Sequence, residues 1–190
     1  MAKKQKILAI GAHPDDIEYY AGATLSRFSA IGYDVTYIIA TDGEKGGDPR
    51  MRIAELERAG HILGVKRYVY LKYPDGELEY NIKLLKEKIL KIILAERPNI
   101  IFSFDPHNQF VVHKDFHPDH RALAVSVVDV ALIDATLAGV RRPKLWLYNP
   151  YRFNRKNNFR LHILKKFLAL GEYKSQNVKD ATRTEKFRLY

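Results

Sequence analysis

The chain has 190 residues, a net charge of +10 from 32 Lys and Arg against 22 Asp and Glu, and no cysteine. This length predicts one domain with a sizeable buried core, and the missing cysteine excludes disulfides, thiolate zinc sites and a cysteine nucleophile. The basic residues are spread along the chain without a block, so a solvated basic surface is favoured over a nucleic-acid interface.

The predicted elements alternate along the chain, with short apolar runs as strands and longer amphipathic stretches as helices. The strands are expected at 6–12, 35–41, 68–71, 100–104 and 144–148. The helices are expected at 16–31, 51–63, 82–95, 118–137 and 159–170. This alternation predicts a single-domain, Rossmann-like three-layer α/β/α sandwich over residues 1–190, with a mostly parallel sheet of about five strands.

The N-terminal apolar run lasts about six residues before polar residues interrupt it. This is too short for the core of a signal peptide or for a membrane span. We therefore expect a cytoplasmic protein.

A dense polar cluster follows the first predicted strand, which ends at Gly11. The cluster contains His13, Asp15, Asp16 and Glu18. Residues just past the carboxyl end of a strand in an open parallel sheet face the crevice where ligands bind. Carboxylates crowded there would repel one another, shift their pKa values or bind a cation with the help of the imidazole. Of these three outcomes, the pattern favours binding of a cation.

A second cluster follows the fourth predicted strand. Of the seven histidines, four lie between His107 and His120, and the tetrad 117–120 (His-Pro-Asp-His) resembles the tetrad 13–16 (His-Pro-Asp-Asp). Each tetrad follows a strand and opens a helix, with proline in the first turn. Both loops leave the same edge of a parallel sheet, so the two tetrads can meet.

Two imidazoles and a carboxylate around an open position form a common catalytic metal site. Zinc takes three such ligands and keeps a water in the fourth place. Non-haem Fe2+ uses a similar ligand set, so the pattern predicts a bound metal without deciding which metal it is. Spacing alone does not choose between His117 and His120, or between Asp15 and Asp16.

Other interpretations of these residues remain. A lone histidine in a loop is more often structural, and an Asp pair at a helix start can simply interact with the helix dipole. A non-hydrolytic nucleotide-binding domain is the alternative function. It is disfavoured because the first strand ends without Gly-x-Gly-x-x-Gly and acids occupy the phosphate position. His61 and His162 lie in helical patterns away from both loops, and we expect them to be structural.

Together the two tetrads resemble the PIG-L / LmbE family of zinc-dependent N-deacetylases, whose substrates are mostly N-acetylglucosamine-containing sugars and glycolipids. Weaker matches occur in order along nearly the whole chain. They are Thr41-Asp42-Gly43-Glu44, Arg52 and Glu55, Asp75-Gly76, Lys166, Ala169-Leu170 and Ser175-Gln176.

The resemblance implies roles for residues of this chain. It makes His13, Asp16 and His120 the metal ligands, Asp15 the general base and His117 the oxyanion partner, with Arg52 and Asp75 contacting the sugar and Glu44 near the site. Some members carry a tyrosine shortly before the second tetrad, where this chain has Lys114-Asp115-Phe116. The resemblance also implies a homo-oligomer, such as a hexamer.

The expected reaction is removal of an N-acetyl group from an N-acetylglucosamine-type sugar, a related glycoconjugate or another small N-acyl compound. A bound zinc lowers the pKa of its water to about 7, and Asp15, beside ligand Asp16, would take the proton of this water. Protonated His117 would stabilise the charge that develops on the acetyl oxygen. Asp119 either orients a histidine or is an ordinary first-turn acid. Arg52 has a simpler interpretation too, as a surface ion pair with Glu55.

Overall fold

The computed structural model describes residues 4–107, 117–150, 152–176, 178 and 181–190. Its centre is one sheet of seven strands in the order β3-β2-β1-β4-β5-β7-β6. The strands are β1 (Lys6–Gly11), β2 (Asp34–Thr41), β3 (Arg67–Tyr73), β4 (Ile100–Phe104), β5 (Lys144–Tyr148), β6 (Arg155–Asn157) and β7 (Glu185–Leu189). Strands β1 to β5 are parallel to one another, and β7 runs antiparallel to both β5 and β6.

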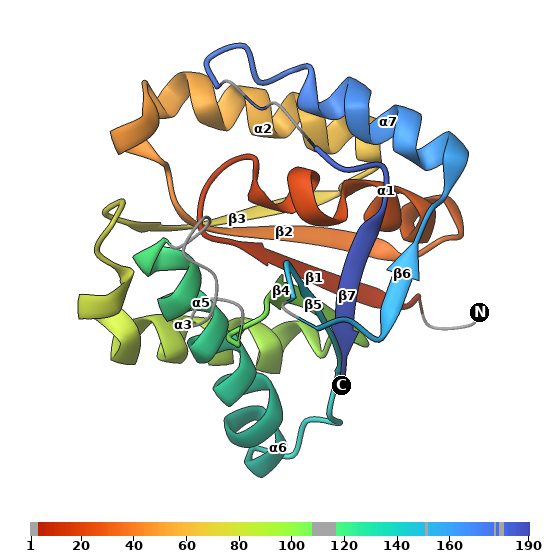
Figure 1. The fold of residues 1–190 in the computed structure, drawn as a ribbon. Helices are drawn as coiled ribbons and strands as arrows, with labels where there is room; N and C mark the ends of the chain where they lie inside the picture. Colours follow the sequence, from red (N-terminus) through yellow and green to blue (C-terminus); the bar gives the residue numbers. More distant parts are fainter. Residues whose placement is uncertain (1–3, 108–116, 151, 177, 179–180) are drawn as a thin grey trace.

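Helices cover both faces of the sheet (Figure 1). One layer holds α1 (Asp16–Ala30), α2 (Pro49–Leu63) and α7 (Arg160–Leu170), and the other holds α3 (Ile82–Glu96), α5 (Pro118–Asp129) and α6 (Ala135–Leu137). Short 3-10 turns lie at Glu44–Gly46 and Leu78–Asn81, and a π-helical segment, Val130–Asp134, joins α5 to α6. The predicted three-layer α/β/α class is therefore confirmed.

The central strands are apolar on both faces because helices cover both. Ile7, Leu8, Ala9 and Ile10 of β1 are all buried. Continuous apolar runs of this kind are typical of parallel strands inside an α/β sandwich. The predicted strand at 144–148 and that at 100–104 have the observed bounds.

Two strands, β6 and β7, were not predicted, which makes the sheet larger than the expected five strands. Strand β7 lies near the C-terminus, where the sequence is polar and gives little local signal. Its Glu185 is buried, accepts hydrogen bonds from the backbone N–H groups of Ala23 and Thr24 in α1, and forms an ion pair with buried Lys166 at 3.1 Å. These long-range contacts secure the strand, and no local periodicity encodes them.

The topology places a switch point between β1 and β4. The chain moves from β1 outward to β2 and β3, then returns to β4 on the other side of β1. Ligands in open α/β sheets bind beside the carboxyl ends of the strands at such a point. The two tetrads follow β1 and β4, so the fold brings them to this crevice.

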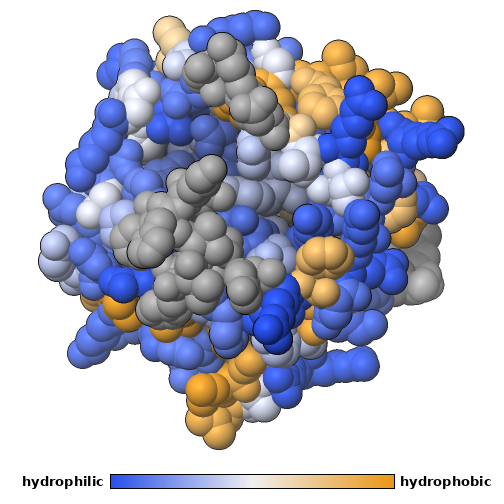
Figure 2. Space-filling view, viewed as in Figure 1, coloured by the Kyte–Doolittle hydropathy of each residue, from blue (hydrophilic) through white to orange (hydrophobic). Residues whose placement is uncertain are grey.

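The surface is largely polar in the view of Figure 2. Exposed apolar side chains gather over α7 and near α6, including Leu161, Leu164, Leu168 and Leu137. Within the described ranges, no helix has both the length and the apolar character needed to cross a bilayer.

Candidate active site

The first tetrad forms the turn between β1 and α1. Gly11 permits this turn, since a Cβ there would lie 3.0 Å from the Ile17 side chain and 3.3 Å from Cβ of Asp16. Asp16 Oδ2 then accepts hydrogen bonds from the backbone N–H of Ala12 at 3.0 Å and of His13 at 2.8 Å. The turn therefore holds the Asp16 carboxylate beside the end of β1.

Asp15 sits at the start of α1 with φ of 101°, a conformation that residues with a Cβ rarely adopt. Arg52 of α2 stabilises it. The guanidinium donates to Asp15 Oδ2 at 3.3 Å, to the carbonyl of Pro14 at 2.9 Å and to the carbonyl of Gly43 at 2.7 Å. Strained backbone of this kind persists only where the surrounding contacts hold it, and it clusters at functional sites.

The second tetrad opens α5. His117 is the N-cap residue, and its Nδ1 accepts a hydrogen bond from the backbone N–H of Asp119 at 3.2 Å. His120 lies one turn further, where its ring stacks on Phe104 of β4 with centroids 4.0 Å apart. Because helix capping uses Nδ1 of His117, its neutral ring carries the hydrogen on Nε2.

Ligand-type atoms of three residues from the two tetrads converge. His13 Nδ1 lies 3.3 Å from His120 Nε2 and 3.6 Å from Asp16 Oδ2, and His120 Nε2 lies 3.2 Å from Asp16 Oδ1. The imidazoles of positions 13 and 120, on which the predicted metal site depended, are therefore neighbours. His13, His117 and His120 also form a group whose ligand atoms all lie within 4.8 Å of one another.

The other ring nitrogen of His13 faces two carboxylates. His13 Nε2 lies 3.0 Å from Asp75 Oδ1 and 3.3 Å from Asp119 Oδ2. An ionised carboxylate can only accept a hydrogen bond, so Nε2 carries the hydrogen and Nδ1 of the neutral ring has a free lone pair. Metal-ligating histidines are commonly oriented in this way, with the second nitrogen donating to a carboxylate.

Asp119 and Asp75 are themselves tightly held. The fully buried Asp119 accepts from the backbone N–H groups of Gly76 at 2.7 Å and Leu78 at 3.0 Å. Asp75 accepts from the N–H of Lys45 at 3.1 Å. Asp119 thus contacts a histidine as well as two backbone donors, and its role in orienting that histidine stays a prediction.

The electrostatics of the site favour a bound cation. Burial and the neighbouring Asp16 charge raise the pKa of Asp15 to about 7, and Arg52 opposes this rise. Burial disfavours the charged form of Asp16, but His120 and His13 outweigh it and hold its pKa well below the usual range. Burial also opposes charge on His13, whose pKa is nevertheless raised well above normal by Asp119, Asp16 and Asp75. Crowded carboxylates that raise the proton affinity of a histidine are equally suited to a metal cation.

The converging atoms open into a cavity of about 410 Å³. It is lined by His13, Asp15, Asp16, Lys45, Gly46, Arg52, Asp75, His117 and His120. A nitrogen and oxygen donor set of this composition suits zinc or Fe2+. The residues present therefore fit the predicted metal.

The remaining predicted residues fall in different places. Glu44 is exposed, and its Oε1 accepts the backbone N–H of Asp75 at 2.7 Å. Glu55 does not pair with Arg52 and instead accepts from the N–H and hydroxyl of Ser175. His61 is exposed and His162 contacts the Ser26 hydroxyl at 3.0 Å, both away from the cavity. Lys114-Asp115-Phe116 and His113 lie outside the described residues.

Sequence reasoning missed two features of the site. One is the contact of Asp75 with His13, because the two residues are 62 positions apart. The available signal was the turn pattern Pro74-Asp75-Gly76 at the end of a strand. The other is the burial of Glu18, which the sequence placed in the polar cluster. Glu18 is fully buried, neither of its carboxylate oxygens is hydrogen-bonded within the described residues, and burial raises its pKa to about 8.

Comparison with known proteins places this geometry in context. A diacetylchitobiose deacetylase from Thermococcus kodakarensis is 36% identical over 126 residues, which are 62% of this chain and 45% of that protein, so the match spans less than half of that relative. A probable N-acetyl-alpha-D-glucosaminyl L-malate deacetylase 2 from Bacillus anthracis is 28% identical over 198 residues, covering 93% of this chain and 83% of that one.

Structural comparison supports the fold. The N,N'-diacetylchitobiose deacetylase of Pyrococcus horikoshii superimposes with a TM-score of 0.82 at 24% identity, covering 98% of this chain and 84% of the other. Residues 8–131 match the family model PIG-L, described as GlcNAc-PI de-N-acetylase. Because this match spans more than half of the 190 residues, the chain belongs to the PIG-L family.

Proposed function

We propose that this protein is a zinc-dependent N-deacetylase that removes the acetyl group from an N-acetylglucosamine-type sugar or glycoconjugate. The observation that carries the proposal is the convergence of His13 Nδ1, Asp16 and His120 Nε2 within 3.6 Å at the switch point of the sheet. Membership of the PIG-L family and the deacetylase names of the relatives support it.

His13, Asp16 and His120 would hold the metal, with Fe2+ as the alternative to zinc. When bound, such an ion lowers the pKa of a water to about 7 and polarises a carbonyl. Asp75 and Asp119 keep the hydrogen of His13 on Nε2, so its Nδ1 lone pair faces Asp16 and His120. The chain thus arranges the donor atoms before any ligand arrives.

Asp15 is proposed as the general base. Its carboxylate lines the cavity next to Asp16 and accepts a hydrogen bond from Arg52. A carboxylate beside the metal ligands, and not itself one, can take a proton from the attacking water and return it to the leaving amine. The C–N bond then breaks to release acetate and a free amine.

His117 is proposed as the oxyanion partner. Its Nδ1 accepts the Asp119 backbone N–H, so Nε2 of the neutral ring can donate. Burial and the nearby His13 and His120 lower its pKa, which favours this neutral form over the protonated ring that was expected from the sequence. A preorganised donor at the acetyl oxygen stabilises charge where it develops in the transition state.

Substrate contacts by Arg52, Asp75 and Glu44 are proposals of the same kind. Arg52 and Asp75 already bind groups of the chain itself, so their first role is to position Asp15 and His13. Exposed Lys45 lines the cavity and exposed Glu44 precedes it in the chain, where we propose that a sugar approaches. The extent of the deacetylase domain (residues 1–190), the homo-oligomeric state and the cytoplasmic location stay predictions.

The alternative, a non-hydrolytic nucleotide-binding domain, is not favoured. Asp15 and Asp16 occupy the start of α1, where a phosphate would otherwise bind the helix N-terminus. Their negative charge would repel a phosphate.

The test is acetate release from N-acetylglucosamine and N,N'-diacetylchitobiose by the metal-stripped protein, before and after addition of zinc or Fe2+. Proton NMR resolves acetate and the free amine in one measurement. We expect release that requires metal and stops in Asp16→Asn. Acetate release that is unaffected by chelation or by Asp16→Asn would contradict the proposal, as would no release from any N-acetylated sugar by the metal-loaded protein.

A further inference from the structure

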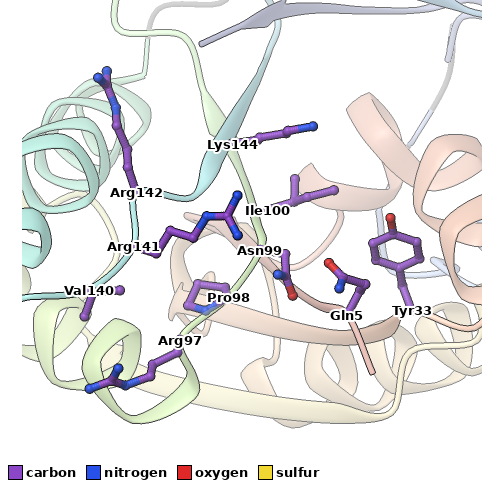
Figure 3. Close-up of a pocket in the computed structure, with 10 residues that line it drawn as sticks. All are labelled: Gln5, Tyr33, Arg97, Pro98, Asn99, Ile100, Val140, Arg141, Arg142 and Lys144. Atoms are coloured by element: carbon purple, nitrogen blue, oxygen red, sulfur yellow. The ribbon is translucent and has the colours of Figure 1, made fainter. Parts of the chain in front are cut away.

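A second cavity lies at the opposite end of the sheet from the active site, beside the amino ends of β1, β4 and β5. It has a volume of about 430 Å³ and is drawn in Figure 3. Its lining is Gln5, Tyr33, Arg97, Pro98, Asn99, Ile100, Val140, Arg141, Arg142 and Lys144. This volume falls in the range of small-molecule sites.

Four of the lining side chains are cationic and none is acidic: Arg97, Arg141, Arg142 and Lys144 are the cations. Across the part of the chain that the structure describes, no ion pair involves any of the four. Figure 3 shows the Arg141 guanidinium beside Asn99, whereas the charged ends of Arg97, Arg142 and Lys144 point away from it in different directions.

The acidic residues nearest in sequence pair with other cations. Glu96, next to Arg97, forms ion pairs with Lys6 at 3.0 Å and with Arg67. Asp34, next to Tyr33, lies 3.4 Å from Lys66 and 3.8 Å from Lys4. Among the residues that the structure describes, the charge of the pocket therefore has no internal counterion.

The floor of the pocket is rigid backbone. Asn99 donates its N–H to the carbonyl of Lys6 at 2.9 Å, and Lys144 donates its N–H to the carbonyl of Asn99 at 2.9 Å. The Asn99 side-chain oxygen accepts the Lys6 backbone N–H at 2.8 Å. This hydrogen bond identifies the accepting atom of the amide as Oδ1, so the other atom, Nδ2, is a donor. Asn99 Nδ2 has no partner among the described residues. A fixed neutral donor thus lies among the cations.

We propose that this basic pocket binds a small molecule carrying two phosphate groups. Each phosphate monoester carries about −1.5 to −2 charges at pH 7, so two of them match the four cations. Arginine guanidinium groups bind phosphate oxygens in a bidentate manner, and Asn99 adds a neutral donor. The four cationic residues line one cavity, which favours a small ligand over a nucleic acid.

The experiment is calorimetric titration of the metal-loaded protein with fructose 1,6-bisphosphate as probe and fructose as the uncharged control. The test variant is Arg141→Gln/Lys144→Gln. The matched control is Lys91→Gln/Lys165→Gln, which removes the same charge from exposed positions outside the pocket. Thermal unfolding of each variant checks that the fold is kept.

We expect the bisphosphate to bind, fructose not to bind, and the pocket variant to weaken binding by at least tenfold, since hydrogen bonds to charged groups are the stronger class. The control variant should change affinity less than threefold. The single variants Arg97→Gln and Arg142→Gln should each weaken binding severalfold, which keeps the test valid if the double variant unfolds. Asp16→Asn should bind the probe as tightly as the natural chain, because the active site is at the other end of the sheet.

Three results would overturn the proposal. One is the absence of probe binding at millimolar concentration. Another is an equal loss of affinity in the pocket and control variants, which would indicate non-specific charge attraction. The third is loss of probe binding in Asp16→Asn, which would place the phosphates at the active site.

Discussion

The two tetrads, 13–16 and 117–120, have similar sequences but use their side chains differently. In the first, the aspartate in the fourth position, Asp16, faces the converging imidazoles, and Asp15 adopts a φ of 101° beside Arg52. In the second, the fourth residue, His120, faces the same point, while Asp119 turns back to the loop after β3. The third residue of each tetrad therefore makes different contacts: Asp15 lies at the cavity beside Arg52, and Asp119 lies against the loop after β3 and the His13 ring.

The difference shows how helix capping assigns roles. His117 caps α5 through Nδ1, which leaves the Asp119 carboxylate free to accept from Gly76 and Leu78. Asp15 makes no capping hydrogen bond at the start of α1, so its carboxylate stays at the cavity. The third residue of each tetrad is an aspartate, and the backbone around it decides whether its carboxylate faces the cavity or the loop after β3.

The largest effect is expected for Asp16→Asn. Asparagine keeps the shape and one acceptor for the Ala12 and His13 N–H groups, but it removes the charge between His13 and His120. We expect bound zinc to be lost and acetate release to fall below detection. Elemental analysis and the NMR assay measure both, and a variant that keeps one zinc per chain would show that Asp16 is not a ligand.

Asp15→Asn should separate the base from the ligands. The variant is expected to keep its zinc while kcat falls by about 10²–10⁴, the usual contribution of general acid–base catalysis. Its matched control is the neighbouring Asp16→Asn, which should lose metal as well. Full activity of Asp15→Asn on a confirmed substrate would mean that another group takes the proton.

His117→Asn is the corresponding change in the second tetrad. Asparagine is a good N-cap residue, so α5 should remain stable, and only the donor toward the acetyl oxygen is removed. We expect kcat to fall by about 10²–10³, as when one oxyanion donor is lost, with metal content unchanged. A rise in KM at constant kcat would instead indicate that His117 only binds the substrate.

Asp119→Asn should give the smallest effect on catalysis. It weakens the contact that orients His13 and places an amide group against one of the two loop N–H donors. Loss of such a supporting carboxylate typically costs about 10–100-fold in metal affinity or activity. Zinc titration and thermal unfolding measure it, and an unchanged zinc affinity would leave Asp119 as a purely structural acid.

Much of the fold was predictable from local pattern. Apolar runs bounded by Gly and Pro located β1, β4 and β5, because a strand buried on both faces must be apolar throughout. Strands β6 and β7 were missed. Strand β7 is secured by contacts of Glu185 with Ala23 in α1, 162 positions away, and with Lys166 in α7. Neither the alternation of a strand, with a period of 2 residues, nor the helical period of 3.6 residues indicates such a contact.

The sequence by itself determined that two polar tetrads follow two strands of a parallel sheet, because turn residues and apolar periodicity are local properties. The tertiary structure decided which atoms meet: Asp75 and Asp119 bind one nitrogen of His13, and Asp16 and His120 approach the other. The physical reason is that strand order brings together segments distant in the chain, such as His13 and Asp75, which are 62 positions apart, and no local pattern records that order.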